Sequence, residues 1–344
     1  AECAAVFAEA DELTMEASAR DAQSARLAGF PYLRSNRLLA SFRNELGQER
    51  KLEAWLMAMR KLDQEARGFE LQNAIDHGKE FNIKLDRCGE LMLHEDLNLP
   101  DQIEKIKQAS VVADSYIVSN RVLGVYPVSR FFVNMGIRQL HASIKQTFSK
   151  PVEALSIRGS LIRYAPRQVK PMSDDELSVL LQGSTSNALS VPSFSASEEE
   201  SLFNQFAPVW EIDTVKNDDR FGSPYWSHAK KLNILTEDSV VYRHLSYTRL
   251  NSQVLPQFNY IIWFPARTAT SALDILAGKL DGLTWRVTVD ITGRVLMYDV
   301  IHNCGCYHMF FPTGDVLMRK PVHSNREESI LVPQRGPILK TGER

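Results

Sequence analysis

Several features that mark common protein classes are missing from this sequence. Its longest apolar runs, such as residues 260–264, fall far short of the roughly 20 residues that cross a bilayer. Its formal net charge is −2, so no overall positive field favours nucleic acid or an anionic membrane. It has no P-loop, no GxGxxG after a strand, no HExxH and no GxSxG. We therefore expect a water-soluble protein with no transmembrane segment, no nucleic-acid partner and none of the commonest enzyme signatures.

The composition lacks the polar bias of a disordered chain. Hydrophobic residues make up 44% of the 344 positions and charged residues 24%, as in ordinary globular proteins. A chain of this length normally divides into two domains. We predict the α+β class, with a helical domain at 1–150, a mainly antiparallel β-rich domain at 151–321 and an extended or loose tail at 322–344.

The first 150 residues carry helical signals. Apolar side chains between Leu52 and Ala66 recur every three or four positions, the spacing of an amphipathic helix. Pro100 suits the first turn of another helix. Gly29-Phe30-Pro31 should end the first helix, because proline cannot continue the hydrogen-bond ladder. We expect helices at 4–28, from Ser35 to 46, at 52–66, 81–97, from Pro100, at 113–125 and at 130–148.

After residue 150 the pattern changes to alternation, which is typical of strands. Two capping-box spacings, Ser173 with Glu176 and Ser197 with Glu200, predict short helices that end near residues 181 and 206. The clearest hairpin joins 283–290 to 294–300, with Gly293 in the left-handed position of a three-residue loop. Other strands are expected at 155–164, 209–213, 240–250 and 258–264, and helical turns at 273–280.

Cysteine is scarce, with four in the whole chain. A Cys3–Cys88 disulfide would close a loop of about 85 residues and contribute roughly 4–5 kcal/mol in the chain-entropy model. Two unrelated buried thiols are an equally open alternative. The sequence starts at Ala1 without a methionine, which fits either a trimmed chain or removal of a signal peptide after a small residue.

The other two cysteines lie in the run His302-Asn303-Cys304-Gly305-Cys306-Tyr307-His308, which also holds two of the eight histidines. If this run continues the hairpin strand, its cysteines and histidines share one face, because alternate residues do. A three-residue hairpin loop would place Arg286 opposite Tyr298 and bring both to that face. A change of one residue in the loop would reverse this placement.

A metal site in this run needs a bend. An extended strand from His302 to His308 spans about 20 Å, whereas a tetrahedral ion lies only about 2.0–2.3 Å from its ligands. Gly305 tolerates positive φ and is the position where the backbone can turn. Cys304 and Cys306 could then chelate one ion together, with His308 or His302 completing the set. Thiolate and imidazole ligands favour zinc or copper.

Two other interpretations remain open for the same residues. Cys304 or Cys306 could be the nucleophile of a redox enzyme or hydrolase, with an imidazole from His302, His308 or His244 as its base. Inert buried thiols and a strained Cys304–Cys306 disulfide are the structural alternatives. For a substrate we assign Arg286 to an anionic group, and we place Tyr298 and His244 in the same pocket.

Several segments together resemble an uncharacterised family of bacterial exported proteins. The resemblance covers most of the chain and implies export, with a periplasmic location, but no activity and no site residue. The segments that carry it are Phe30 to Arg34, Asn259 to Pro265, Asp281-Gly282-Leu283-Thr284-Trp285, Tyr298-Asp299, His302 to His308 and Phe310-Phe311-Pro312.

The leading hypothesis is an exported metal-binding protein that could be a metalloenzyme, with zinc or copper at Cys304, Cys306, His308 and His302. A thiol-dependent redox enzyme or hydrolase is the second hypothesis. The third is a non-catalytic interaction module in which the helical domain docks a partner. The sequence specifies neither a small-molecule nor a protein partner.

Overall fold

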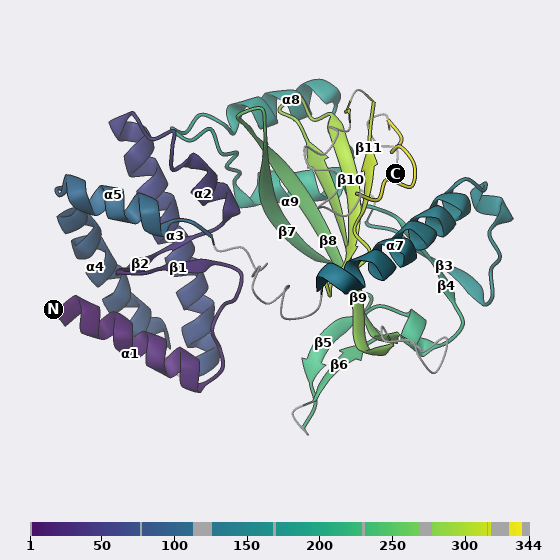
Figure 1. Cartoon of the computed structure of the whole chain (residues 1–344), viewed down its shortest axis with the longest axis horizontal. Helices are drawn as coiled ribbons and strands as arrows, with labels where there is room; N and C mark the ends of the chain where they lie inside the picture. Colours follow the sequence, from purple (N-terminus) through teal and green to yellow (C-terminus); the bar gives the residue numbers. More distant parts are fainter. Residues whose placement is uncertain are drawn as a thin grey trace. The chain divides into compact units, whose positions relative to one another are not determined.

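The structure, a computed structural model, divides into two compact units (Figure 1). Unit 1 comprises Ala1–Val118 with Asn187–Leu189, and unit 2 comprises Ser119–Ser186 with Ser190–Arg344. Helices dominate unit 1 and antiparallel sheets dominate unit 2, which confirms the α+β class. The structure describes residues 2–75, 78–112, 126–167, 170–228, 231–267, 277–314, 316–317 and 330–338.

Unit 1 consists of helices packed around a short hairpin, as Figure 1 shows in purple and blue. α5 begins at Pro100 as predicted, with the proline in its first turn. A disulfide between Cys3 and Cys88 joins α1 to α4. The elements are α1 Glu2–Glu16, β1 Ala25–Leu27, β2 Phe30–Ser35, α2 Arg37–Phe42, α3 Glu49–Ala74, α4 Gly78–Leu97 and α5 Pro100–Ala109.

The predicted helix over residues 4–28 is wrong in its second half. α1 ends at Glu16, and β1 and β2 pair as an antiparallel hairpin. Gly29 has φ +85° between them, a conformation that glycine adopts without a side-chain penalty. Asn36, rather than Ser35, caps α2 by accepting a hydrogen bond from the Leu39 N–H. The helix expected at 113–125 lies outside the described residues.

Unit 2 is built on a five-stranded antiparallel sheet in the order β11-β10-β9-β8-β7. Two smaller sheets pair β3 with β4 and β5 with β6. The main strands are β7 Tyr242–Leu250, β8 Gln253–Arg267, β9 Gly278–Val289, β10 Val295–His302 and β11 Met309–Pro312. The other elements are α7 Tyr126–Phe148, η1 Val152–Ala154, β3 Ser160–Tyr164, α8 Asp174–Gly183, α9 Ala196–Gln205, β4 Trp210–Thr214, η2 Asn217–Asp219, β5 Ser223–Trp226 and β6 Leu232–Leu235.

Local signals in unit 2 predict some element ends well and others poorly. The capping box of Ser173 and Glu176 begins α8 as expected. α9 starts two residues before its predicted box, because the Glu198 carboxylate accepts from the Ser195 backbone and Ser195 accepts from Glu198 in turn. Residues 278–280 belong to β9 and are not helical, and residues 273–276 lie outside the described part. α7, predicted as part of the helical domain, belongs to unit 2.

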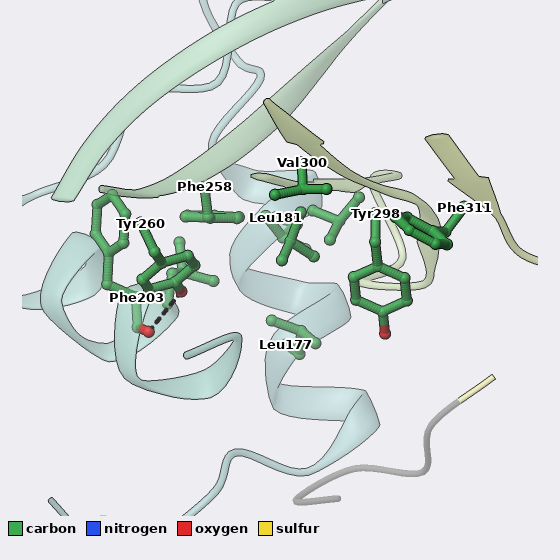
Figure 2. Close-up of a cluster of buried hydrophobic side chains, with 11 residues drawn as sticks. Leu177, Leu181, Phe203, Phe258, Tyr260, Tyr298, Val300 and Phe311 are labelled. Atoms are coloured by element: carbon green, nitrogen blue, oxygen red, sulfur yellow. Dashed lines mark hydrogen bonds between the residues drawn. The ribbon is translucent and has the colours of Figure 1, made fainter. Parts of the chain in front are cut away.

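One face of the five-stranded sheet packs against α8 and α9 to form an aromatic and aliphatic core (Figure 2). The Tyr260 hydroxyl donates to the Phe203 carbonyl at 2.7 Å. Phe203 also meets Phe258 edge-on, with ring centroids 5.3 Å apart. Alternation along the strands therefore leaves the intervening residues on the opposite face. Core members include Leu177, Leu181, Leu202, Phe203, Phe258, Tyr260, Val287, Val289, Tyr298, Val300 and Phe311.

Part of the predicted loose tail packs on the sheet. Leu331 is buried and bridges Met309, and the Gly336 N–H donates to the Pro312 carbonyl at 3.0 Å. Residues 330–338 therefore lie along the β11 edge without forming a helix, and the rest of the predicted tail, 322–329 and 339–344, lies outside the described residues. No helix among the described residues is both long and apolar enough to cross a membrane.

Candidate functional site

The cysteine-containing run forms a tight turn between β10 and β11 and is not a strand. The Gly305 N–H donates to the His302 carbonyl at 2.7 Å, and the His302 N–H donates to the Cys306 carbonyl at 3.0 Å. Gly305 has φ +88°, so the chain reverses there. The predicted continuous strand is therefore wrong, because β10 ends at His302. The bend that we required at Gly305 is present.

The turn carries two free thiols, with Cys304 exposed and Cys306 half-buried. A hydrogen bond with the Cys304 side chain raises the pKa of Cys306, and partial burial and the nearby Asp281 carboxylate raise it further. The positive charge of Arg267 acts in the opposite direction on the same pKa. The raised pKa keeps Cys306 as a neutral thiol near neutral pH.

An imidazole and a carboxylate belong to the same turn region. His302 Nδ1 lies 3.2 Å from the Asp281 carboxylate at the start of β9. This hydrogen bond is the main reason that the pKa of Asp281 is lowered. The Tyr307 ring lies 5.3 Å from the His302 ring, and Arg267 lies over Tyr307 at 5.7 Å. Sequence reasoning missed Asp281 and Arg267, because neither has a motif spacing to the cysteines.

His308 belongs to a different cluster. Its Nε2 lies 2.9 Å from Asp299, which Arg286 also holds through two hydrogen bonds of 2.9 and 2.6 Å. Asp299 is only 1% exposed. Burial would raise its pKa, but the hydrogen bonds from His308 and Arg286 outweigh burial, and the pKa is lowered. A lone acidic residue between Tyr298 and Val300 in an apolar strand was the signal that could have identified it.

The predicted register of the β9–β10 hairpin is wrong by one residue. The pairing shifts between Val295 and Met297, so Asp299 lies opposite Arg286 and Tyr298 lies opposite Val287. An extra residue of this kind moves every later side chain to the other face of the sheet. Arg286 therefore shares the polar face with Asp299, whereas Tyr298 belongs to the packed core.

The predicted substrate residues are not gathered in one pocket. Arg286 is occupied by the Asp299 carboxylate, and Tyr298 lies on the core face. His244 is exposed on β7, and its carbonyl accepts a hydrogen bond from Asn259 at 2.7 Å. On β8, Asn259 pairs with His244 of β7 on one side and with Arg286 of β9 on the other. His244 and Arg286 therefore lie on the same face of the sheet, but two strands apart.

The predicted metal ligands divide among three places. Cys304 and Cys306 share the turn, His302 faces Asp281, and His308 faces Asp299. Within the described ranges, no group of three or more His, Cys, Asp or Glu side chains is arranged closely enough to hold an ion. The predicted metal site therefore stays a prediction. It requires the His302 or His308 side chain to move away from its carboxylate partner.

Comparison with family models, with curated proteins and with solved structures finds no match for this chain. The resemblance to an exported bacterial family accordingly stays a prediction.

Proposed function

We propose that the Cys304-Gly305-Cys306 turn is a dithiol site that exchanges electrons with disulfides, in a protein exported to the periplasm. The observation that supports this proposal is the pair of free thiols two residues apart on one turn, with Cys304 exposed. Reactive cysteines need access to solvent and a neighbouring group that stabilises the attacking sulfur. Cys304 has the access, and Cys306 is the neighbouring thiol on the same turn.

The exchange consists of two balanced steps. The Cys304 thiolate attacks one sulfur of a substrate disulfide, whose S–S bond breaks and releases the first substrate thiol. Cys306 then loses its proton, which we assign to His302 on the same turn, and attacks the Cys304 sulfur. The second substrate thiol leaves with a proton, and Cys304 and Cys306 are left as a disulfide. Two electrons pass from the protein pair to the substrate.

The Cys3–Cys88 disulfide in unit 1 supports the proposed location. Disulfides persist in secreted and periplasmic proteins and are rare where the cytosol keeps thiols reduced. In such a compartment, a pair of free thiols on one turn fits a pair that is oxidised and regenerated in cycles. Export is thus part of the proposal, together with the sequence resemblance.

Titration in glutathione redox buffers tests the exchange. We expect the peptide that contains residues 304–306 to interconvert between a dithiol and an internal disulfide, read by mass after rapid acid quenching and alkylation. Cys306→Ser should trap a mixed disulfide between Cys304 and glutathione, because the resolving thiol is gone. Cys304→Ser is the matched control and should trap much less adduct.

Two results would contradict the exchange. One is that Cys304 and Cys306 form no internal disulfide at any ratio of reduced to oxidised glutathione. The other is that Cys306→Ser and Cys304→Ser trap equal amounts of the glutathione adduct. Because only the thiolate of Cys306 can attack, closure of the mixed disulfide in the wild-type protein should accelerate as pH increases above neutrality.

Binding of copper or zinc is the second candidate. The observation that favours it is the bend at Gly305, which places two soft sulfur ligands side by side. A third ligand requires His302 to leave Asp281, or comes from outside the chain. Under reducing conditions we expect about one Cu(I) per chain with proton release, lost in Cys304→Ser. His302→Ala should weaken binding more than His308→Ala, and binding by the cysteine variant would rule this candidate out.

A further inference from the structure

Unit 2 contains a second feature that has no part in the thiol site. A cavity of about 700 Å³ lies between the core face of the sheet, the end of α7, α8 and the C-terminal segment. Small-molecule pockets usually have volumes of about 300–1,000 Å³ and predominantly apolar walls. Here the walls include Phe148, Leu177, Trp285, Tyr298, Phe311 and Ile338.

The aromatic walls of the cavity are held in place by their own packing. Trp285 stacks on Tyr298 with ring centroids 5.5 Å apart, and Phe148 packs on Phe311 at the same distance. Gly336 closes one side, since a Cβ there would lie 2.8 Å from the Phe311 carbonyl and 2.9 Å from the Tyr298 ring. The C-terminal segment therefore lies directly against the aromatic wall.

Tyr298 offers this cavity an unused polar group. The residue is 7% exposed, and its hydroxyl makes no hydrogen bond with any residue that the structure describes. Figure 2 shows the hydroxyl pointing away from Val300 and Phe311. Its oxygen is not one of the fully buried unpaired atoms of the described residues, so solvent or a ligand can reach it. Burial also raises the pKa of Tyr298, so the hydroxyl is neutral and can donate.

Three other polar residues of the lining are already engaged, whereas Gln334 makes no hydrogen bond with any residue that the structure describes. The Gln205 side chain accepts from the Met172 N–H at 3.0 Å, and the Thr292 hydroxyl donates to Asp290 at 2.6 Å. Arg294 also pairs with Asp290 at 3.3 Å. A charged ligand group would therefore lose its hydration in an apolar space without a dedicated partner.

We propose that this cavity binds an uncharged small molecule with an apolar, ring-sized body and one hydrogen-bond acceptor that receives the Tyr298 hydroxyl. The aromatic walls supply contact area for the body of the ligand, and Tyr298 fixes its orientation. The function is separate from that of the cysteine turn, because none of the turn residues lines the cavity.

A matched pair of probes, acetylnaphthalene and ethylnaphthalene, tests the proposal by calorimetric titration of the full chain. The two molecules have nearly the same shape, and only the first has a carbonyl acceptor. We expect one site per chain, with the acetyl compound bound about fivefold more tightly. Tyr298→Phe should remove that preference and leave the affinity for ethylnaphthalene within about twofold.

Blocking variants locate the binding. Val300→Trp should fill the cavity and abolish binding of both probes. Val179 lies on α8 and is 74% exposed, so Val179→Trp should leave the binding of both probes unchanged. If Val300→Trp does not fold, Ile338→Glu places a charge on a wall residue that is already 73% exposed and should weaken both probes. Non-saturable binding, equal affinity of the two probes, or unchanged binding in every folded blocking variant would overturn the proposal.

Discussion

Among the described residues, unit 1 buries four charged side chains beside its apolar core, whereas unit 2 buries Asp299 alone beside its own. The interior of unit 1 holds complete ion pairs, with Arg34 0% exposed and Glu70 1% exposed. The interior of unit 2 holds rings and aliphatic chains, with Phe258 and Val289 fully buried. Hydrophobic burial is non-directional, whereas a buried charge requires specific partners. The stability of the first unit should therefore depend on its buried charges and on pH, whereas that of the second should depend on how well its apolar core is filled.

Arg34 is at the centre of the charged interior. Its guanidinium donates to Asp63 at 2.8 Å and to Glu70 at 2.7 Å. Arg67 donates to Asp63 at 2.8 Å and also to the Pro31 carbonyl at 2.7 Å, which connects α3 to the hairpin. A buried pair of this kind adds little beyond well-packed apolar residues, but it penalises the loss of either member. The network therefore fixes the position of β2 against α3 more than it adds to the net stability of the unit.

Arg34→Met gives the largest expected effect. It leaves Asp63 and Glu70 buried with fewer partners, and we expect unit 1 to lose about 3–5 kcal/mol of unfolding free energy. Hydrogen exchange read by mass spectrometry, peptide by peptide, reports the two units separately. Lys61→Met is the control, because Lys61 is an exposed residue paired with Glu65 at 3.8 Å, and should change stability by less than about 1 kcal/mol. A loss below about 1 kcal/mol for Arg34→Met would refute the specific role of the network.

Leu181→Ala is the corresponding change in unit 2. Leu181 is buried between α8 and the sheet, so truncation should cost about 2–5 kcal/mol through lost burial and a new cavity. The cost should not change with pH, since no charge is uncovered. Val179→Ala on the exposed side of the same helix should stay within about 0.5 kcal/mol. A strong pH dependence of the Leu181→Ala loss would erase the contrast between the units.

Acid should destabilise unit 1, with the smallest of the three effects. Burial alone would raise the pKa of Glu70, but the hydrogen bonds from Arg34 and the Asp21 backbone outweigh it and lower the pKa. The pKa of Asp21 is also lowered, because bonds from Ser24 and Gln23 outweigh its partial burial. A lowered folded-state pKa gives stability that is present above the ordinary carboxyl range and lost as pH falls through the folded value.

Asp63 acts in the opposite sense, since burial raises its pKa, and it reduces the acid loss that Glu70 and Asp21 produce. Unit 1 should therefore lose protection between about pH 5 and pH 3. Exchange rates corrected for intrinsic pH dependence give the measurement. Arg34→Met should flatten this acid loss in unit 1, and an unchanged profile in that variant would refute the assignment.

The helices of unit 1 were predictable, but its charged interior was not recognised. Leu56 and Met59 belong to the apolar stripe of α3, and Asp63, Arg67 and Glu70 continue the same face at spacings of three and four. Charges at that spacing are normally read as a solvated surface. They are buried because β2 places Arg34 against them, and a contact so distant in sequence leaves no local signal.

The sequence pointed to the region of the candidate site, but not to its geometry. The concentration of cysteine and histidine singled out residues 302–308 as a predicted strand, and Gly305 was the position where a bend was predicted. A single-residue shift before Met297 then reversed the faces of Arg286 and Tyr298. Such an irregularity depends on how several strands pack at once. The apolar cavity is equally invisible in the sequence, because it is enclosed by α7, α8 and the C-terminal segment together.

The disulfide of unit 1 has a consequence for the covalent connectivity of the chain. Cys3 and Cys88 make residues 3–88 a closed ring that contains α1, the hairpin, α2, α3 and most of α4. A single protease cut anywhere within that ring opens it without releasing a fragment. The partners of Arg34 would thus remain tethered to one another after cleavage, and two cuts or a reductant would be needed to separate them.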